Sequence, residues 1–250
     1  MAKKLLRILL FSMITLILVM GVIAYSLNEP VPSGTSGKEA DLLALKMEEA
    51  INKSAWNNIR WVTWTFPGEK IYVWDKYRQY LQIEWGGKRV IMNLRTKEGK
   101  AWQEKQAVSG NTAKKFIKSA WENFCNDSFW FIAPSKISDK GVKRELVNLA
   151  TGEKALKIIY QDGGVTPGDV YLWELDTKTN LPKSYKMWVK ILPIGGLKST
   201  WENWQTLPGG AKVATIRKIG PMKIKITNIK SGKTFKDCGL GKDPFYLINQ

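Results

Sequence analysis

The side chains in this sequence that could carry out catalysis are carboxylates. Asp75, Glu84, Glu174 and Glu202 lie on or beside segments with a strand pattern. Two carboxyl groups that face each other across a cleft would act on glycosidic bonds. Nothing in the spacing pairs these residues, so we interpret them as surface charges. A carboxylate-based glycan hydrolase is kept only as a third candidate function.

The sequence contains no histidine. This excludes Ser-His and Cys-His nucleophile pairs, histidine-containing zinc sites and the usual general base at neutral pH. The two cysteines, Cys125 and Cys238, are too few for a thiolate zinc site and too far apart for a Cys-x-x-Cys redox motif. They form either one disulfide or two separate thiols. We therefore expect a protein that is not an enzyme and that carries no metal or cofactor.

The elements that position these residues are predicted to be mainly antiparallel strands. Alternating apolar and polar residues predict strands at 60–66, 70–75, 79–85, 88–94, 142–148, 154–160, 170–176, 185–191, 198–206, 211–218 and 222–229. The gaps within the first meander, 60–94, and the second, 170–229, are too short for a crossover helix. Trp188 falls on the polar face of its strand, so it is either exposed or covered by another segment.

Apolar residues at helical spacing predict two helices, at 38–56 and 112–125, that pack on the sheet. An apolar segment, 128–134, follows the second helix and should end at Pro134. The tail after Gly232 has no clear pattern, although its apolar residues at 245–248 could dock on the domain.

The first 27 residues predict a membrane segment. Lys3, Lys4 and Arg7 precede an uncharged apolar run at 8–27, which as a helix would be about 30 Å long. Basic residues on its N-terminal side favour a cytoplasmic N-terminus and an exported remainder. The length of the run favours an uncleaved anchor in the cell membrane, although cleavage near Ser26 would release the domain to the periplasm. We expect an anchor or signal segment at 1–27, a linker at 28–37 and one exported domain at 38–250.

The net charge of the chain is +17 at neutral pH. A surface this basic attracts anionic partners, such as acidic lipid headgroups, acidic glycans or another anionic envelope component. Lysines on the outer faces of strands also maintain solubility and block edge pairing, and this second interpretation stays open. We do not expect nucleic acid to be the partner.

The order of elements and several short motifs of the second meander resemble a known family. The motifs are a strand ending in Leu175-Asp176, a turn to Leu181-Pro182, Trp-Glu-Asn-Trp at 201–204, Leu-Pro-Gly-Gly at 207–210, and Met-Lys-Ile-Lys-Ile-Thr-Asn at 222–228. They are similar to the periplasmic lipoprotein carriers, the outer-membrane lipoprotein localisation factors. The likeness covers nearly the whole exported part, by element order more than by identity. This chain departs from the family in two ways. The carriers are soluble after signal removal, whereas this chain is expected to stay anchored. Their ligand-shuttling residues also cannot be matched to particular positions here.

The resemblance implies a mainly β, α+β fold. In such a fold an antiparallel sheet curls into an incomplete β-barrel, two helices pack on it, and the hollow holds acyl chains. Inward residues would then line the hollow, and the candidates are Trp64, Phe66, Leu81, Ile83, Trp85, Trp173, Met187 and Trp201. An ordinary filled barrel would use the same side chains as its core, so the sequence leaves both possibilities open.

Two further candidate functions follow. The first is a membrane-anchored, exported, non-catalytic binding protein for an apolar or amphipathic ligand, such as a lipid or a lipoprotein acyl chain. The second is a cell-envelope interaction protein whose basic surface or Trp188 region docks a partner or a polyanion.

Overall fold

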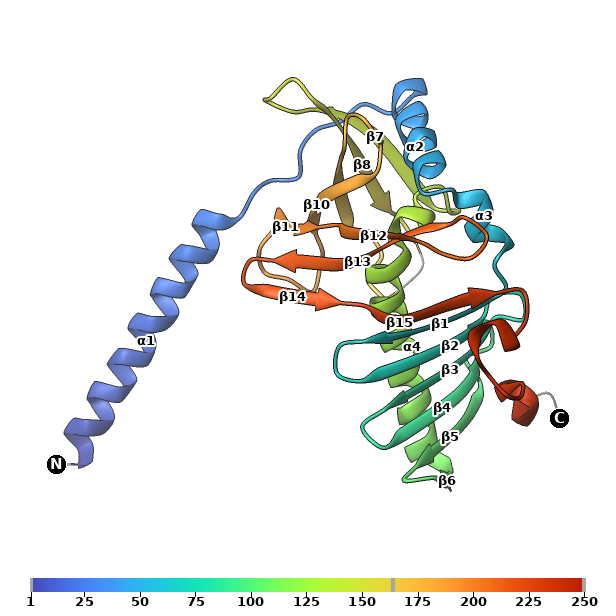
Figure 1. Cartoon of the computed structure of the whole chain (residues 1–250). Coiled ribbons are helices and arrows are strands. Elements are labelled where there is room, and N and C mark those ends of the chain that lie inside the picture. Colours follow the sequence, from blue (N-terminus) through green and yellow to red (C-terminus); the bar gives the residue numbers. More distant parts are fainter. Residues whose placement is uncertain (1, 163–164, 249–250) are drawn as a thin grey trace.

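The computed structural model of the chain describes residues 2–162 and 165–248. Helix α1 (Ala2–Leu27) stands apart from the rest of the molecule, and a short segment joins it to a body of curled sheets (Figure 1). The other helices are α2 (Lys38–Ala50), α3 (Lys53–Asn58) and α4 (Gly110–Ile132), with the 3-10 helices η1 (Ala133–Lys136), η2 (Lys236–Cys238) and η3 (Pro244–Ile248).

The strands of the described residues form three antiparallel sheets, none of which closes. A seven-stranded sheet has the order β15-β1-β2-β3-β4-β5-β6, a five-stranded sheet the order β11-β10-β9-β8-β7, and a three-stranded sheet the order β12-β13-β14. The bounds are β1 (Trp61–Phe66), β2 (Lys70–Asp75), β3 (Tyr80–Trp85), β4 (Lys88–Asn93), β5 (Gly99–Gln103), β6 (Gln106–Val108), β7 (Val142–Asn148), β8 (Lys154–Tyr160), β9 (Val170–Leu175), β10 (Pro182–Trp188), β11 (Leu197–Thr200), β12 (Glu202–Thr206), β13 (Lys212–Ile219), β14 (Met222–Lys225) and β15 (Thr227–Gly232). This mainly β architecture agrees with the incomplete barrel expected from the sequence.

Two bends join the three sheets into one curled surface. Only Trp201 separates β11 from β12, and only Ile226 separates β14 from β15. The backbone N–H groups of both residues still donate to the neighbouring strand, at 2.7 Å and 2.9 Å, so the ladders run through the bends. Just beyond them, Asn203 and Asn228 adopt the left-handed region, at φ 55° and 53°, which asparagine tolerates better than most residues. Such irregularities increase local bending, and they divide the strands predicted at 198–206 and 222–229 between two sheets.

Helix α4 lies along the concave side of this surface (Figure 1). Its buried residues Phe116, Ala120 and Phe124 pack on the inward face of the seven-stranded sheet. The helix is longer than the predicted 112–125 because Ser128, Phe131 and Ile132 continue the same buried face. The apolar segment that follows the predicted helix therefore belongs to it.

The predicted helix at 38–56 is instead two helices. Asn52 has φ 53°, which is outside the right-handed helical region, and its side chain accepts a hydrogen bond from the Ala55 N–H at 3.2 Å. This caps the start of α3. The short strands β5 and β6 have no counterpart among the predicted strands, because only Ala101 is buried in them and the alternation is weak.

The linker that follows α1 is held against the five-stranded sheet. The Glu29 carbonyl accepts a hydrogen bond from the Trp188 indole N–H at 2.7 Å, and the Glu29 N–H donates to Gly195 at 3.0 Å. Farther along the linker, the Lys157 ammonium donates to the Pro32 carbonyl at 2.8 Å, and Thr35 forms an isolated antiparallel β-bridge with Leu146 of β7. Of the two expectations for Trp188, the covered one is therefore correct.

The C-terminal tail packs on the outer face of the seven-stranded sheet. Phe245 stacks on Trp61 with ring centroids 5.5 Å apart, and Cys238 belongs to the same buried cluster. Cys125 lies on α4, on the other face of that sheet, and both cysteines are free thiols. The structure thus contains the two separate thiols rather than the disulfide.

Within the described part of the chain, no helix combines the length and the apolarity of a membrane-spanning helix. The membrane segment at 8–27 therefore stays a prediction.

The turn between β2 and β3 is organised by a buried carboxylate, which gives a first prediction. Asp75 is fully buried, and it accepts hydrogen bonds from Arg60 at 2.9 Å and Arg78 at 2.6 Å. Burial by itself raises the pKa of Asp75, but the hydrogen bonds from the two guanidinium groups hold that pKa below its usual value. Because the folded pKa is depressed, the stability that Asp75 contributes is present above the unfolded pKa of about 3.9 and is lost as pH falls through the folded value.

We expect Asp75→Asn to lower the free energy of unfolding at pH 7 by about 2 kcal/mol, because two charge-assisted hydrogen bonds weaken. Urea unfolding followed by tryptophan fluorescence at pH 7, 5 and 3 measures this, and the difference from the wild type should shrink towards pH 3. Glu49→Gln, at an exposed position of α2, is the control and should change stability by less than about 0.5 kcal/mol. Equal stabilities of Asp75→Asn and Glu49→Gln at pH 7 would contradict the prediction.

Candidate ligand-binding site

The side chains predicted to line a hollow all occur in the core, in two groups. Trp64, Phe66, Leu81 and Ile83 are buried in the cluster under the seven-stranded sheet, and Trp85 packs against it partly buried. A second cluster, under the five- and three-stranded sheets, contains Trp173, Met187 and Trp201. The curled surface therefore brings the predicted residues to its concave side.

Helix α4 covers this concave side with its own aromatic residues. Phe131 lies 5.3 Å from Trp64 and Phe124 lies 6.4 Å from it, as ring centroids. Trp130 approaches Tyr185 of the second group at 5.9 Å. These helix residues were not among the predicted lining residues, although Phe124 lies on the apolar face of the predicted helix and Trp130 and Phe131 lie in the predicted apolar segment at 128–134.

A buried carboxylate on the same helix attaches it to β2. Asp127 is fully buried and accepts hydrogen bonds from the Tyr72 hydroxyl at 2.5 Å and the Lys70 ammonium at 2.7 Å. Burial, followed by the charge and hydrogen bond of Asp127, raises the pKa of Tyr72 far above its usual value. The hydroxyl therefore remains a hydrogen-bond donor over the whole physiological range.

A small cavity lies where the two groups of core residues meet. It has a volume of about 10 Å³, and the residues around it include Trp56, Phe131, Trp201 and Trp204. This is room for at most one water molecule. With α4 in place, this junction of the concave face is thus nearly filled.

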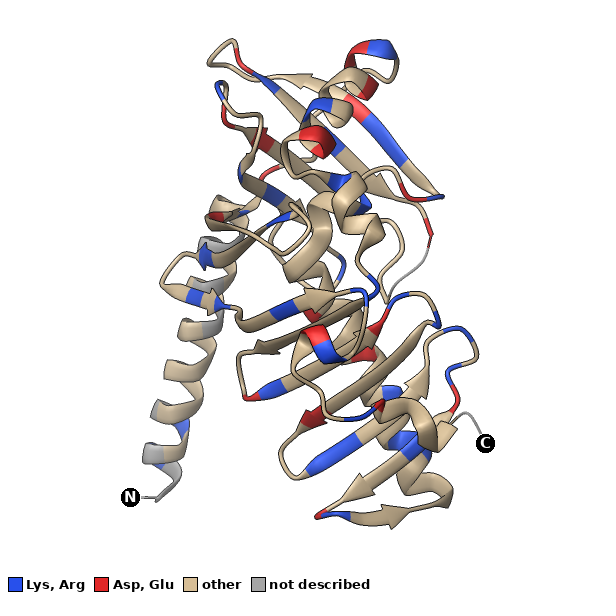
Figure 2. Ribbon diagram, turned by 45° about the vertical axis from the view of Figure 1, so that its right-hand side comes forward, with Lys and Arg blue, Asp and Glu red and all other residues tan. Residues whose placement is uncertain are grey.

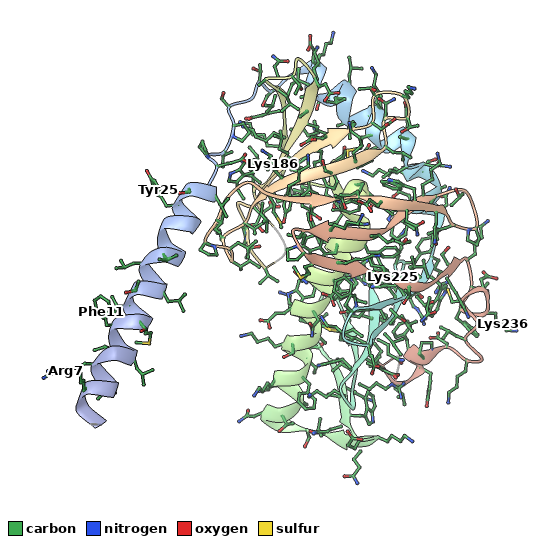
Figure 3. The ribbon with its side chains drawn as sticks, turned by 60° about the vertical axis from the view of Figure 1, so that its left-hand side comes forward. Arg7, Phe11, Tyr25, Lys186, Lys225 and Lys236 are labelled. Atoms are coloured by element: carbon green, nitrogen blue, oxygen red, sulfur yellow. The ribbon has the colours of Figure 1, made fainter. Side chains whose placement is uncertain are left out.

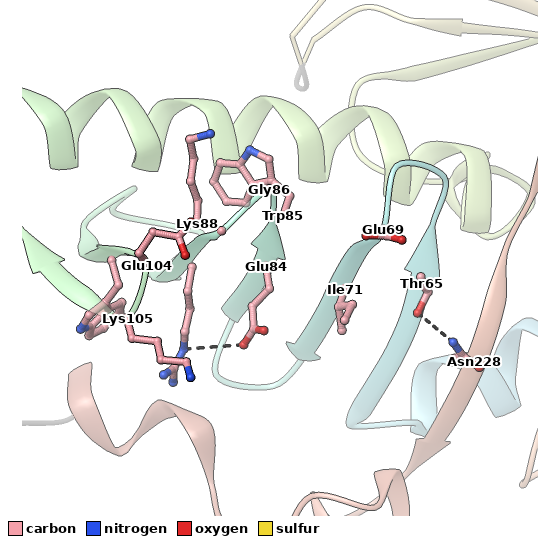
Figure 4. Close-up of a pocket in the computed structure, with 13 residues that line it drawn as sticks. Thr65, Glu69, Ile71, Glu84, Trp85, Gly86, Lys88, Glu104, Lys105 and Asn228 are labelled. Atoms are coloured by element: carbon pink, nitrogen blue, oxygen red, sulfur yellow. Dashed lines mark hydrogen bonds and ion pairs between the residues drawn. The ribbon is translucent and has the colours of Figure 1, made fainter.

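A larger, open groove of about 820 Å³ lies on the outer face of the seven-stranded sheet (Figure 4). Neighbouring strands supply Thr65, Ile71, Glu84, Arg89 and Trp102 to it as successive cross-strand partners. The turn residues Glu69, Glu104 and Lys105, together with Lys88 at the start of β4, add charges of both signs. The groove has no dominant charge and no buried titratable group, so its geometry selects no ligand class.

The carboxylates considered for catalysis each pair with a cation rather than with one another. The shortest ion-pair distances are 2.6 Å for Asp75 to Arg78, 3.9 Å for Glu84 to Arg89, 3.0 Å for Glu174 to Lys198 and 2.9 Å for Glu202 to Lys218. A glycoside hydrolase needs two facing carboxyl groups, one of them protonated. The structure does not bring these residues together in that way.

The charged residues are spread over the whole body. Figure 2 shows lysines and arginines on every sheet, interspersed with acidic residues. Many of the basic side chains form ion pairs, among them Lys143 and Lys157 with Glu145 and Arg144 with Asp41. Over the part of the chain that Figure 2 colours, no single basic face stands out for a polyanion. Among the described residues, no group of three His, Cys, Asp or Glu side chains is placed to hold a metal ion.

Comparisons with known proteins give distant structural likenesses. No family model matches the chain, and no curated protein matches its sequence. A crystal structure of a DUF1329 family protein from Desulfovibrio piger has a TM-score of 0.39 at 11% identity, over 82% of this chain and 96% of that chain. A putative outer membrane lipoprotein-sorting protein domain from Vibrio parahaemolyticus has a TM-score of 0.34 at 10% identity, over 78% of this chain and 97% of that chain. One of these two distant likenesses is to a lipoprotein-sorting domain, the kind of protein that the element order resembles.

The Asp127 contacts give a second prediction. Asp127→Ala leaves the buried Tyr72 hydroxyl without its acceptor, so we expect a loss of about 2–4 kcal/mol in the free energy of unfolding. Backbone amides of α4 from Asn123 to Ile132 should exchange hydrogen faster, as measured by mass spectrometry.

The matched control is Asp139→Ala, which removes an exposed ion pair of 2.7 Å to Lys136. This pair should contribute less than about 1 kcal/mol. If α4 exchanged at the same rate in both variants, Asp127 would not be the attachment point of the helix.

Proposed function

We propose that this protein is a non-catalytic binding protein of the cell envelope that takes an apolar or amphipathic molecule, such as a lipid or a lipoprotein acyl chain, onto its concave face. The observation that carries the proposal is that this aromatic concave face is covered by amphipathic helices and not by a second sheet: α4 packs on the seven-stranded sheet and reaches the second cluster with Trp130, and α2 adds Ala44 and Met47 to that cluster. An acyl chain and the apolar face of α4 offer the same kind of surface to the sheet. The ligand would therefore occupy the place of the helix.

The energetics of such an exchange favour a reversible carrier or sensor. Burying a chain stabilises the complex by about 0.8 kcal/mol per CH₂ group. Displacing α4 costs the contacts of Phe124 and Phe131 and the hydrogen bonds of Asp127. The two changes oppose each other, so the helix limits the affinity and keeps binding reversible.

Helix α1 would attach the protein to a membrane. Large apolar side chains that the structure describes on it are exposed, including Phe11 at 73% and Leu18 at 64%. Figure 3 shows α1 standing clear of the body, with Arg7, Phe11 and Tyr25 extending from it. Large exposed apolar surfaces mark membrane or partner contacts. With basic residues at its N-terminal end, α1 would place the domain on the periplasmic or extracellular side.

Two features support a binding rather than a catalytic role. The sequence has no histidine, and the strand carboxylates are engaged with lysines and arginines. The scattered charge pattern also favours an apolar ligand over a polyanion as the primary partner.

The proposal is tested by photo-labelling. The full chain, in nanodiscs of phosphatidylcholine, is irradiated with a diazirine-bearing palmitic acid, and the modified peptides are identified by mass spectrometry. We expect modified residues on β9, β10 and α4. Because ligand and helix compete for one face, Asp127→Ala should raise the labelling severalfold by increasing the open fraction.

Asp139→Ala should label like the wild type. Modification confined to α1, with Asp127→Ala unchanged, would mean that the probe meets only the membrane segment and would refute the proposal.

A further inference from the structure

Arg217 is a buried cation without an anionic partner among the described residues. It lies on β13, is fully buried, and donates to the backbone carbonyls of Ile216 at 3.0 Å, Trp130 at 2.8 Å and Ala214 at 3.2 Å. In the part of the chain that the structure describes, no carboxylate forms an ion pair with it, and its Nε–H has no acceptor. Burial lowers the pKa of Arg217 to about 9, so the group is still charged at neutral pH. Buried charges are normally paired, because an isolated one is strongly destabilising.

Two indole N–H groups that also lack acceptors belong to the aromatic cluster beside this cation. The guanidinium carbon lies 3.3 Å from the centroid of the Trp201 ring, and the Trp201 and Trp173 rings are 5.0 Å apart. Neither indole N–H has a hydrogen-bond acceptor, although both are buried. More than about 90% of buried polar groups in folded proteins have a partner. The buried indole N–H groups of Trp64 and Trp74 also lack acceptors, but only in this cluster do such donors accompany a buried guanidinium group. This combination suits an acceptor that is supplied from outside the chain.

Helix α4 occupies one of the positions that such an acceptor would take. The Trp130 carbonyl, which accepts from Arg217 Nη2, is contributed by α4, whereas Ala214 and Ile216 belong to the same strand as the arginine. When α4 leaves the concave face, Nη2 and Nε of Arg217 become available together. A carboxylate or phosphate can bind these two donors in the bidentate geometry that arginine favours.

We propose that Arg217, with the indole N–H groups of Trp173 and Trp201, forms the subsite that binds the anionic headgroup, a carboxylate or a phosphate, of the amphipathic ligand. This inference rests on the proposed function, since the subsite opens only when α4 is displaced. The apolar chain would lie along Tyr185 and Met187, which belong to the same cluster. The oxygen of the headgroup takes the place of the Trp130 carbonyl and neutralises the buried charge.

The test is competition against the photo-labelling of the full chain by diazirine-bearing palmitic acid. The competitors share one chain length and differ in the headgroup: palmitic acid, hexadecyl phosphate and neutral methyl palmitate. We expect at least one of the two anions to compete at a concentration at least tenfold lower than methyl palmitate. The better of the two identifies whether the headgroup is a carboxylate or a phosphate.

Variants assign the preference to Arg217. In Arg217→Met the tenfold preference for an anionic competitor over methyl palmitate should disappear, while methyl palmitate competes as in the wild type. Arg217→Lys should keep part of this preference. Arg89→Met, in the outer groove, is the control and should keep all of it. If Arg217→Met does not fold, Arg217→Lys decides, because an undiminished preference in that variant overturns the assignment.

The failures of the two proposals are distinguishable. If all three molecules compete equally in the wild type, the anionic subsite is refuted and the apolar site stands. If concave-face labelling never occurs, the proposed function itself fails.

Discussion

The apolar concave face of a sheet that is curled but not closed must be covered, and most of the structure follows from this requirement. Two one-residue bends at Trp201 and Ile226 link three sheets into one surface without closing it. The hollow that results is wide enough for a helix, and α4 lies in it (Figure 1). Burying large aromatic rings from both sides is strongly favourable. The same surface is therefore a core with α4 in place, and under the proposed function it would be an apolar site when α4 is displaced.

The buried polar groups beneath α4 differ in whether their hydrogen bonds and charges have full partners within the chain. Asp127 has two side-chain donors from β2 and attaches the C-terminal part of the helix to the seven-stranded sheet. Arg217 meets the same part of the helix, at Trp130, but it has only backbone carbonyls as acceptors and stacks on Trp201. On the side of β2 the helix is thus held by an ion pair to a buried carboxylate, whereas on the side of β13 it covers a charge that is incompletely compensated.

The sequence was a good guide to local structure and to which face of each strand turns inward. The alternation of residues gave most strands to within a few positions, and the eight predicted inward residues are all buried or partly buried in the core. The predictions failed where a single residue departs from regular geometry. Asn52 divides a helix, and Asn203 and Asn228 bend strands, because asparagine in the left-handed region leaves little trace in a pattern of hydrophobicity.

The sequence by itself determined that the protein is rich in antiparallel strands, that it lacks histidine chemistry and that its first 27 residues are apolar with a basic start. These properties depend on residue types and short-range order. The tertiary structure alone decided that α4 fills the concave face, that the linker covers Trp188 and that the C-terminal tail covers Trp61. It also decided that Arg217 is buried without an anionic partner among the described residues. Such facts depend on contacts between segments far apart in the chain, where packing and desolvation outweigh local preference.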